Sequence, residues 1–186
     1  MGLLTIIKKQ KAKDREIRVL MLGLDNAGKT TIVTTMLGGS ISTVSPTMGF
    51  QIKTVTYNQH NLNIWDVGGQ TTLRGFWGNY FDKTDVVIWV IDALSTERLE
   101  ESFRELQEKV VQQDRLSGVC LAVVVNKIDL LSSELDIQNL LTNINGVLNL
   151  HDQISDRERW AIFPVSGKTG TGVKDVLDWV SAREYY

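Results

Sequence analysis

The sequence has almost no cysteine, no long apolar run and no excess of positive charge, and each absence excludes a class of protein. Cys120 is the single cysteine in 186 residues, which rules out an internal disulfide and a cysteine-only zinc site. No uninterrupted apolar stretch approaches the roughly 20 residues of a membrane-spanning helix. The formal net charge of −2 argues against general nucleic-acid binding. We therefore expect a globular protein of a reducing intracellular compartment, with Cys120 as an inert buried thiol.

The charge is unevenly distributed along a chain whose length and composition suit one domain of ordinary size. Apolar residues make up 42% and charged residues 23% of the sequence, as in soluble globular proteins. Residues 1–18 hold six Lys and Arg against two Asp and Glu, a charge of +4, so the remainder carries −6. A basic arm on an acidic body suggests a segment that seeks a surface or a partner, although most short lysine runs are simply solvated.

Residues 1–16 predict an amphipathic N-terminal helix that precedes a domain at residues 17–186. Leu3, Leu4 and Ile7 fall on one helical face, and lysines cluster beyond them. Such a helix has three uses: it lies on a membrane, inserts into a groove of a partner, or packs against its own domain.

The N-terminal glycine lies in an incomplete lipidation pattern. Myristoylation of Gly2 requires Ser or Thr at position 6, where Ile6 stands. The chain also ends without a cysteine that could take a prenyl group. Because stable anchoring usually takes two signals, we expect no lipid and at most weak membrane contact through the N-terminal helix.

The run Gly23–Thr30 matches the phosphate-loop pattern G-x-x-x-x-G-K-[ST], with an apolar strand-like segment before it and a helix-like segment after it. Its glycines let backbone N–H groups face a polyphosphate, Lys29 reaches the outer phosphates, and the Thr30 hydroxyl binds Mg²⁺. The alternative, a glycine turn with a chance lysine, does not account for the flanking strand and helix. The loop residues predicted to bind nucleotide are Gly23, Asp25, Asn26, Ala27, Gly28, Lys29, Thr30 and Thr31.

Strand and helix patterns alternate through the rest of the chain and predict an α/β fold. Parallel strands joined by helices require a three-layer α/β/α arrangement around a mostly parallel six-stranded sheet, with ligands at the carboxyl ends of the strands. Asn58–Asn61 is predicted as a hairpin turn, with His60 facing solvent and without function. The predicted strands lie at residues 17–22, 50–57, 62–66, 86–92, 119–125 and 161–165, and apolar helix faces at 99–110, 137–144 and 173–180.

Asp66–Gln70 follows a predicted strand and carries the residues of a magnesium and water site. Asp66 holds Mg²⁺ through its water shell, Gly69 offers a backbone N–H to a γ-phosphate, and Gln70 orients a water. In isolation the same residues also fit an ordinary turn with an exposed glutamine. Arg74 is predicted to lie on the surface of the following helix.

Asn126–Asp129, at the end of the fifth predicted strand, selects the base. The Asp129 carboxylate accepts from the N1–H and N2 amine of guanine, and adenine lacks that donor pair. Lys127 lays its apolar stem over the base, and Asn126 ties this loop to the phosphate loop. Ser166 and Gly167 offer backbone N–H groups to guanine O6, a weaker signal.

Together with Pro46-Thr47, these motifs resemble the five nucleotide motifs of small GTPases over nearly the whole chain. The amino-acid sequences of Gly23–Thr30 and of Trp65–Gln70 are similar to those of the Arf and Arf-like branch. Two departures are a longer segment at residues 149–160, and Gly167 where the family commonly has alanine. The resemblance implies the small-GTPase version of the P-loop NTPase fold, with GTP or GDP and Mg²⁺ as cofactors.

The resemblance also implies roles for single residues. Thr47 closes on Mg²⁺ and the γ-phosphate in the GTP state together with Gly69, and Gln70 is the catalytic residue. Hydrolysis is expected to be slow without a GTPase-activating protein (GAP), because residues 40–50 supply no arginine finger. The predicted metal residues are thus Thr30, Thr47 and Asp66, and the predicted effector-binding aromatics are Phe50, Trp65 and Tyr80, for which core packing is the alternative.

The partners implied by the resemblance are a GAP, an exchange factor and effectors, among them tubulin-folding cofactor D and carriers of lipidated proteins. We therefore expect a cytoplasmic monomer with a role in tubulin folding and microtubule function, in part associated with the cytoskeleton or membranes. Two alternatives remain: a membrane-traffic GTPase of the Arf type, and a nucleotide-bound scaffold that does not cycle. A metabolic phosphate-loop kinase would leave Asn126–Asp129 without a purpose.

Overall fold

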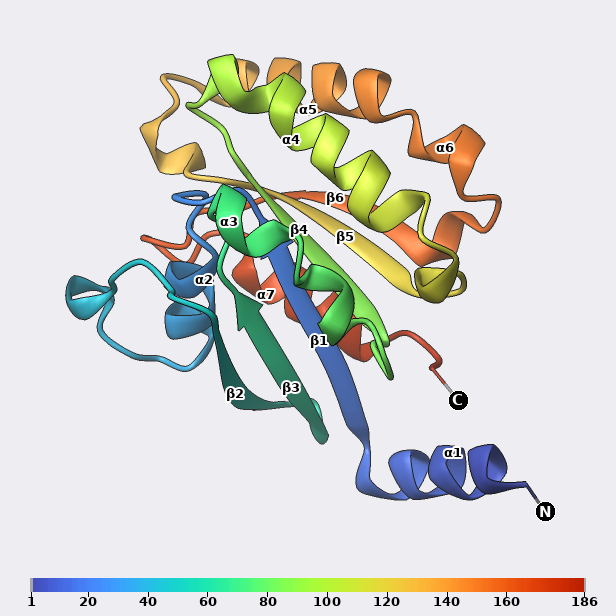
Figure 1. Cartoon of the computed structure of the whole chain (residues 1–186). Helices are drawn as coiled ribbons and strands as arrows, with labels where there is room; N and C mark the ends of the chain where they lie inside the picture. Colours follow the sequence, from blue (N-terminus) through green and yellow to red (C-terminus); the bar gives the residue numbers. More distant parts are fainter. Residues whose placement is uncertain (1, 186) are drawn as a thin grey trace.

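The computed structural model describes residues 2–185, apart from the side chains of residues 8 and 11–14, and consists of a six-stranded sheet between two helical layers (Figure 1). Within the described residues, β2 alone runs antiparallel to its neighbour and the other strands are parallel, so the predicted mostly parallel sheet is confirmed. The strand order is β2-β3-β1-β4-β5-β6. The strands are β1 (Glu16–Gly23), β2 (Phe50–Tyr57), β3 (His60–Val67), β4 (Val86–Asp92), β5 (Cys120–Asn126) and β6 (Trp160–Pro164).

The strands in the middle of the sheet are apolar because they are buried. β4 and β5 are continuous apolar runs whose side chains are covered on both faces, as expected for parallel strands between helices. Successive strand residues point to opposite faces, and each face supports its own core cluster. Trp77 and Trp89 meet edge to face at 5.7 Å in the cluster beneath α4, and both are fully buried.

The helices divide between the two faces of the sheet. Apolar residues of α2 and α7 belong to one core cluster, and those of α4 and α5 belong to the other. α4 continues into a π-helical turn at Gln107–Val111, and the Ser133 side chain caps α5 by accepting from the Asp136 N–H at 3.2 Å. The helices are α1 (Leu3–Asp14), α2 (Lys29–Met36), α3 (Thr71–Arg74), α4 (Leu99–Leu106), α5 (Glu134–Leu148), α6 (Leu150–Gln153) and α7 (Val173–Ser181).

The predicted hairpin turn between β2 and β3 was too long by two residues. The turn consists of Asn58 and Gln59, which both have positive φ (46° and 63°), the backbone form of a tight type I′ turn. His60 pairs with Tyr57 as the first residue of β3 and is half-buried, so it is not the solvent-facing turn residue that was expected.

The segment at residues 149–160, which the sequence predicted to be longer than in related proteins, is part of the folded domain. It forms α6 and a 3₁₀ turn at Arg157–Arg159 before β6 begins. Leu150 is completely buried and joins the core cluster under α4 and α5. Residues 149–160 therefore contribute to that layer.

The N-terminal helix projects beyond the start of β1 (Figure 1). Leu3 and Leu4 are 73% and 76% exposed, so the structure does not show the packing of this helix on its own domain. Met1 and the side chains of Lys8, Lys11 and Lys13, which belong to the predicted helix and its basic cluster, lie outside the described residues. Across residues 2–185, the helices are too short or too polar to span a lipid bilayer. The domain boundary at residue 16 stays a prediction.

Candidate functional site

The predicted motifs meet at the carboxyl ends of β1, β3, β5 and β6, where they form two adjoining parts. The first is a cavity of about 500 Å³ between the phosphate loop, the loop at residues 41–47 and residues Gly68–Gln70. We call it the phosphate end. The second part, the base end, is formed by the loops that carry Asn126–Asp129 and Ser166–Gly167, which lie beside the cavity and not in its wall. An elongated ligand with a polyanionic part and a flat part would span both.

The phosphate loop is wrapped so tightly that glycine is required at position 28. Gly28 has φ 96°, and an added Cβ would lie 2.2 Å from Asn126 Nδ2. α2 begins at the next residue, and no side chain caps its first turn. The free N–H groups and the positive end of the helix dipole therefore face the cavity, as an anion site requires. Asn26, Thr30 and Thr31 line the same cavity.

Lys29 lies inside the loop that precedes it. The residue is 6% exposed, and Nζ donates to the carbonyl oxygens of Gly23 and Leu24 at 3.0 and 2.8 Å. Burial lowers the pKa of Lys29 to about 8, because desolvation disfavours the charged form of the amine. A phosphate group beside Nζ would supply the missing anionic partner.

Thr30, Thr47 and Asp66 bring their side-chain oxygens together at one side of the cavity. Thr30 Oγ1 donates to Asp66 Oδ2 at 2.6 Å and lies 2.5 Å from Thr47 Oγ1. Asp66 is 1% exposed, burial raises its pKa, and within the described chain its Oδ1 has no hydrogen-bond partner. A buried carboxylate with hydroxyl neighbours is a donor set of oxygens that suits Mg²⁺, so these residues fit the predicted ion.

Gly69 and Gln70 complete this cavity. An added Cβ on Gly69 would lie 2.3 Å from the Gly23 carbonyl oxygen, so only glycine fits this close approach to the phosphate loop. Gln70 Nε2 contacts Met48 Sδ at 3.8 Å, and its buried Oε1 has no hydrogen-bond partner in residues 2–185. The Gln70 side chain thus keeps an unused acceptor beside the cavity.

At the base end, Asn126 connects three loops. Its Nδ2 donates to Ala27 O at 2.9 Å, and its Oδ1 accepts from the Gly167 N–H at 2.9 Å. The contact with the phosphate loop is the one expected from the sequence. Lys127 Nζ donates to Asn26 O at 2.8 Å and to Asp92 Oδ2 at 2.7 Å. Sequence reasoning missed Asp92, whose only signal is its place at the end of β4.

Asp129 is exposed, so its carboxylate is open to a base. Its Oδ1 accepts from Ser166 Oγ at 2.7 Å, and Ser166 is itself fully buried and also accepts from the Thr169 N–H at 3.0 Å. The serine therefore orients the carboxylate through its side chain. The contact between the Ser166 backbone and guanine stays a prediction.

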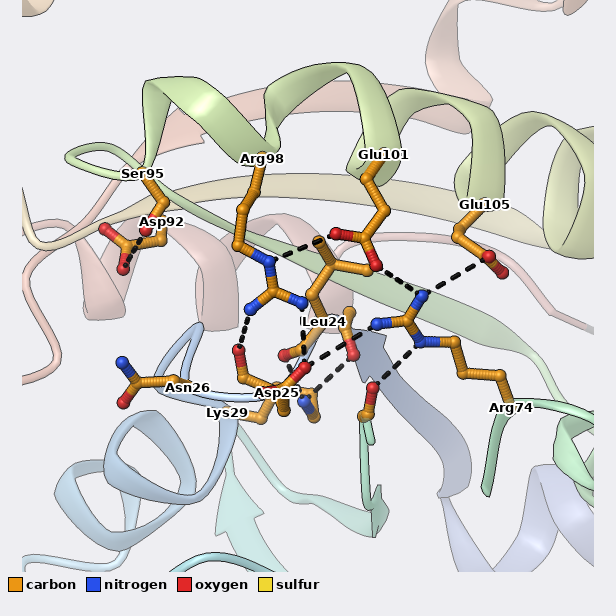
Figure 2. A network of polar contacts seen from close by, with 12 residues as sticks. Leu24, Asp25, Asn26, Lys29, Arg74, Asp92, Ser95, Arg98, Glu101 and Glu105 are labelled. Carbon is orange, nitrogen blue, oxygen red and sulfur yellow. Dashed lines mark hydrogen bonds and ion pairs between the residues drawn. The ribbon is translucent and has the colours of Figure 1, made fainter. Parts of the chain in front are cut away.

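Arg74 does not lie on a helix surface, and that prediction was wrong. The residue is 4% exposed, because α3 is a single turn that folds back over Gly69. Figure 2 shows its guanidinium between the phosphate loop and α4, beside that of Arg98. Arg74 Nε donates to Gly69 O at 2.9 Å, and Arg98 Nη2 donates to Asp25 Oδ1 at 2.8 Å. These contacts join segments far apart in the sequence, so no local pattern indicated them.

Phe50, Trp65 and Tyr80 form an aromatic cluster at the junction of β2, β3 and the turn after α3. Phe50 stacks on Trp65 with ring centroids 5.5 Å apart, and Tyr80 lies 5.3 Å from Phe50. Arg18 packs over the Trp65 ring at 4.1 Å. Phe50 is exposed while the other two are half-buried. The cluster is a partly exposed apolar surface beside the phosphate end.

Comparisons with known proteins agree with this geometry. Residues 3–184 match the model of the ADP-ribosylation factor family. ADP-ribosylation factor-like protein 2 of Arabidopsis thaliana is 46% identical over 97% of this chain and 94% of its own length. ADP-ribosylation factor-like protein alp41 of Schizosaccharomyces pombe is 47% identical over 97% and 93%. The Arl6 BBS3 small GTPase of Trypanosoma brucei, solved with the nucleotide analogue GppNp, superposes with a TM-score of 0.75 at 27% identity, covering 89% of this chain and 95% of that one.

Proposed function

The chain belongs to the ADP-ribosylation factor family of small GTPases, and from that premise we propose that it is a GTP/GDP switch with slow hydrolysis, which acts through partner proteins. One observation carries the proposal: a buried lysine, a magnesium-type oxygen set and an unpaired glutamine acceptor share one cavity. Beside them lies a carboxylate that is open to guanine.

Binding uses the two ends differently. At the phosphate end, the N–H groups of the loop and Lys29 hold the phosphates, and Mg²⁺ neutralises part of their charge when it is bound. Thr30 and Asp66 would hold that ion, directly and through water. At the base end, Asp129 accepts the two donors of guanine.

The switch depends on the segments that carry Thr47 and Gly69. Both residues line the cavity, so a γ-phosphate and its ion would hold both segments in place. Loss of that phosphate would release them. Because Phe50 follows the first segment in β2 and Tyr80 follows the second, such a change would alter the aromatic cluster that we assign to effector binding.

Hydrolysis would use Gln70 to orient a water toward the γ-phosphate. Arg74 and Arg98 stand near the loop but are already paired with carboxylates, so neither is offered to the phosphate. Intrinsic turnover should therefore be slow, and a GAP that supplies an arginine would accelerate it by about 10³–10⁵-fold.

Single-turnover hydrolysis of GTP, with and without cell extract, tests this function. We expect slow intrinsic hydrolysis, acceleration by extract, and loss of that acceleration in Gln70→Leu. Gln138→Leu, which changes an exposed glutamine of α5, is the matched control and should behave as the unmodified chain. A chain that binds GTP but never hydrolyses it, even with extract, would be the non-cycling scaffold.

For the cellular role, we propose tubulin folding and microtubule function, with cofactor D and carriers of lipidated proteins as partners of a cytoplasmic monomer. The support is the near full-length similarity to relatives named ADP-ribosylation factor-like protein 2, together with the partly exposed aromatic cluster. Pull-down of purified cofactor D by GTP-loaded and GDP-loaded protein tests it. Equal or absent capture in both states would contradict this role.

The exposed leucines of α1 favour a second candidate, a membrane-traffic GTPase. Mass spectrometry of the protein from its own cells would decide between the two. A myristoyl group on Gly2 would favour the traffic role, and an unmodified glycine would favour the cytoplasmic one.

A further inference from the structure

The phosphate loop contains an acid where a polyanion is expected. Asp25 lines the same cavity as Lys29, Gly69 and Gln70. A carboxylate free to turn into that cavity would repel the phosphates, because like charges interact strongly where the surroundings are partly desolvated. The loop therefore needs a means of holding this charge aside.

Two arginines hold it. Arg98 Nη2 donates to Asp25 Oδ1 at 2.8 Å, and Arg98 Nη1 donates to the Asp25 carbonyl oxygen at 3.1 Å (Figure 2). Arg74 Nη2 lies 3.6 Å from the same Oδ1. Arg74 is almost completely buried, and among the described residues this Nη2 has no hydrogen-bond partner, so Asp25 is its nearest recorded anion. One carboxylate oxygen thus faces two guanidinium groups.

Helix α4 fixes both arginines from the other side. Glu101 accepts from Arg74 Nη1 at 2.7 Å through Oε1 and from Arg98 Nε at 3.1 Å through Oε2. Glu105 lies 3.3 Å from Arg74 Nη1. The guanidinium groups are therefore anchored on α4, which is not part of the cavity wall.

We propose that Arg98 and Arg74 are positioning residues that clamp the Asp25 carboxylate out of the phosphate cavity, so that the loop can accept the outermost phosphate. The inference rests on the proposed nucleotide site and adds to it an electrostatic requirement. It gives the two arginines a task other than contact with the phosphate.

The clamp acts at the outer-phosphate end. An added Cβ on Gly69 would lie 2.5 Å from the Asp25 N atom, so the Gly69 backbone packs directly against this residue. Arg74 Nε also donates to Gly69 O at 2.9 Å. Since Gly69 is the residue expected beside the γ-phosphate, a released carboxylate should disturb the triphosphate more than the diphosphate.

Equilibrium binding of GDP and of a non-hydrolysable GTP analogue, both with Mg²⁺, tests the clamp. In Arg98→Ala we expect affinity for the analogue to fall about tenfold or more, and affinity for GDP about threefold or less. Adding Asp25→Asn to that variant should restore the affinity for the analogue to within about threefold of the unmodified chain. Such a rescue is the result expected when a repulsive charge is removed.

Arg183→Ala is the matched control, because Arg183 is also a partly exposed arginine with a carboxylate, Glu158, 4.0 Å away, but lies outside both parts of the site. It should bind both nucleotides normally. An equal loss for both nucleotides in Arg98→Ala, or a loss that Asp25→Asn does not repair, would show that Arg98 merely supports the loop and would overturn the inference. Failure of the unmodified chain to bind either nucleotide would instead refute the proposed function.

Discussion

The phosphate end and the base end of the site differ in how far they are closed. At the phosphate end, Lys29, Thr47 and Asp66 are buried and bonded to protein atoms in the places where phosphate and ion would bind. At the base end, Asp129 is exposed, and a buried serine already orients it. One end must exchange its internal contacts for those of the ligand, whereas the other is open and preformed. The first should control affinity for every nucleotide, and the second should control which base is accepted.

Lys29→Met should have the greatest effect on the phosphate end, because it removes the charge and keeps most of the apolar part of the side chain. Because a buried cation facing phosphate is worth several kcal/mol, we expect affinity for GTP and GDP alike to fall about a hundredfold or more. Isothermal titration calorimetry measures both. Lys174→Met, at an exposed lysine paired with Asp178 on α7, is the control. A variant that still binds GDP normally would contradict the role given to the phosphate end.

Asp129→Asn should change base selection without a general loss of binding. Guanine then faces an amide instead of a carboxylate, so GTP affinity should fall about ten- to a hundredfold, while xanthosine triphosphate, with a carbonyl at position 2, should gain. Competition between the two nucleotides measures the ratio. If both nucleotides weaken equally, Asp129 is a general support and not a base reader.

Ser166→Ala should have a smaller effect on the base end. The variant removes the hydrogen bond to Asp129 but leaves its charge, so we expect GTP affinity to fall about three- to tenfold with guanine preference retained. Nucleotide competition against Ser155→Ala, an exposed serine outside the site, provides the measurement and its control. A reversal of base preference would mean that Ser166 itself reads the base.

The smallest expected effect is a dependence of stability on pH at the phosphate end. The hydrogen bond from Arg98 holds the pKa of Asp25 below its ordinary value. A carboxylate whose pKa is lowered in the folded state stabilises the fold at pH values above its ordinary pKa near 4. This stabilisation is lost as the pH falls through the lowered pKa of the folded state. Asp25 is partly exposed, so urea unfolding should show Asp25→Asn about 0.5–1 kcal/mol less stable at pH 7. The difference should disappear near pH 3; a constant difference would exclude an ionic origin.

The sequence predicted those parts of the molecule whose signal is local. The phosphate loop, the strand before it and the helix after it form one continuous stretch, and glycine at position 28 is required by the backbone itself. The buried strands β4 and β5 could be predicted because parallel strands between two helical layers are apolar throughout. The nucleotide and metal roles of single residues stay predictions, although the structure brings them together.

The two wrong predictions have different causes, one of which is distance in the chain. Arg74 is buried because Asp25, Glu101 and Glu105 surround it, and nothing near Arg74 in the sequence indicates those partners. The hairpin between β2 and β3 was misplaced because Asn, Gln and His side chains do not distinguish a two-residue turn from a four-residue one. The φ values of Asn58 and Gln59 decide it, and they follow from strand pairing.

The side chain of Asn126 has a consequence for how a nucleotide leaves. Its amide group donates to the carbonyl oxygen of Ala27 and accepts from the N–H of Gly167. A protein that displaces the phosphate loop or the Gly167 loop would therefore also destabilise the other loop, because both are hydrogen-bonded to the same amide group. Guanosine and pyrophosphate added as separate fragments should accordingly help each other to bind, and an exchange factor would need to grasp only one end of the ligand to free the whole.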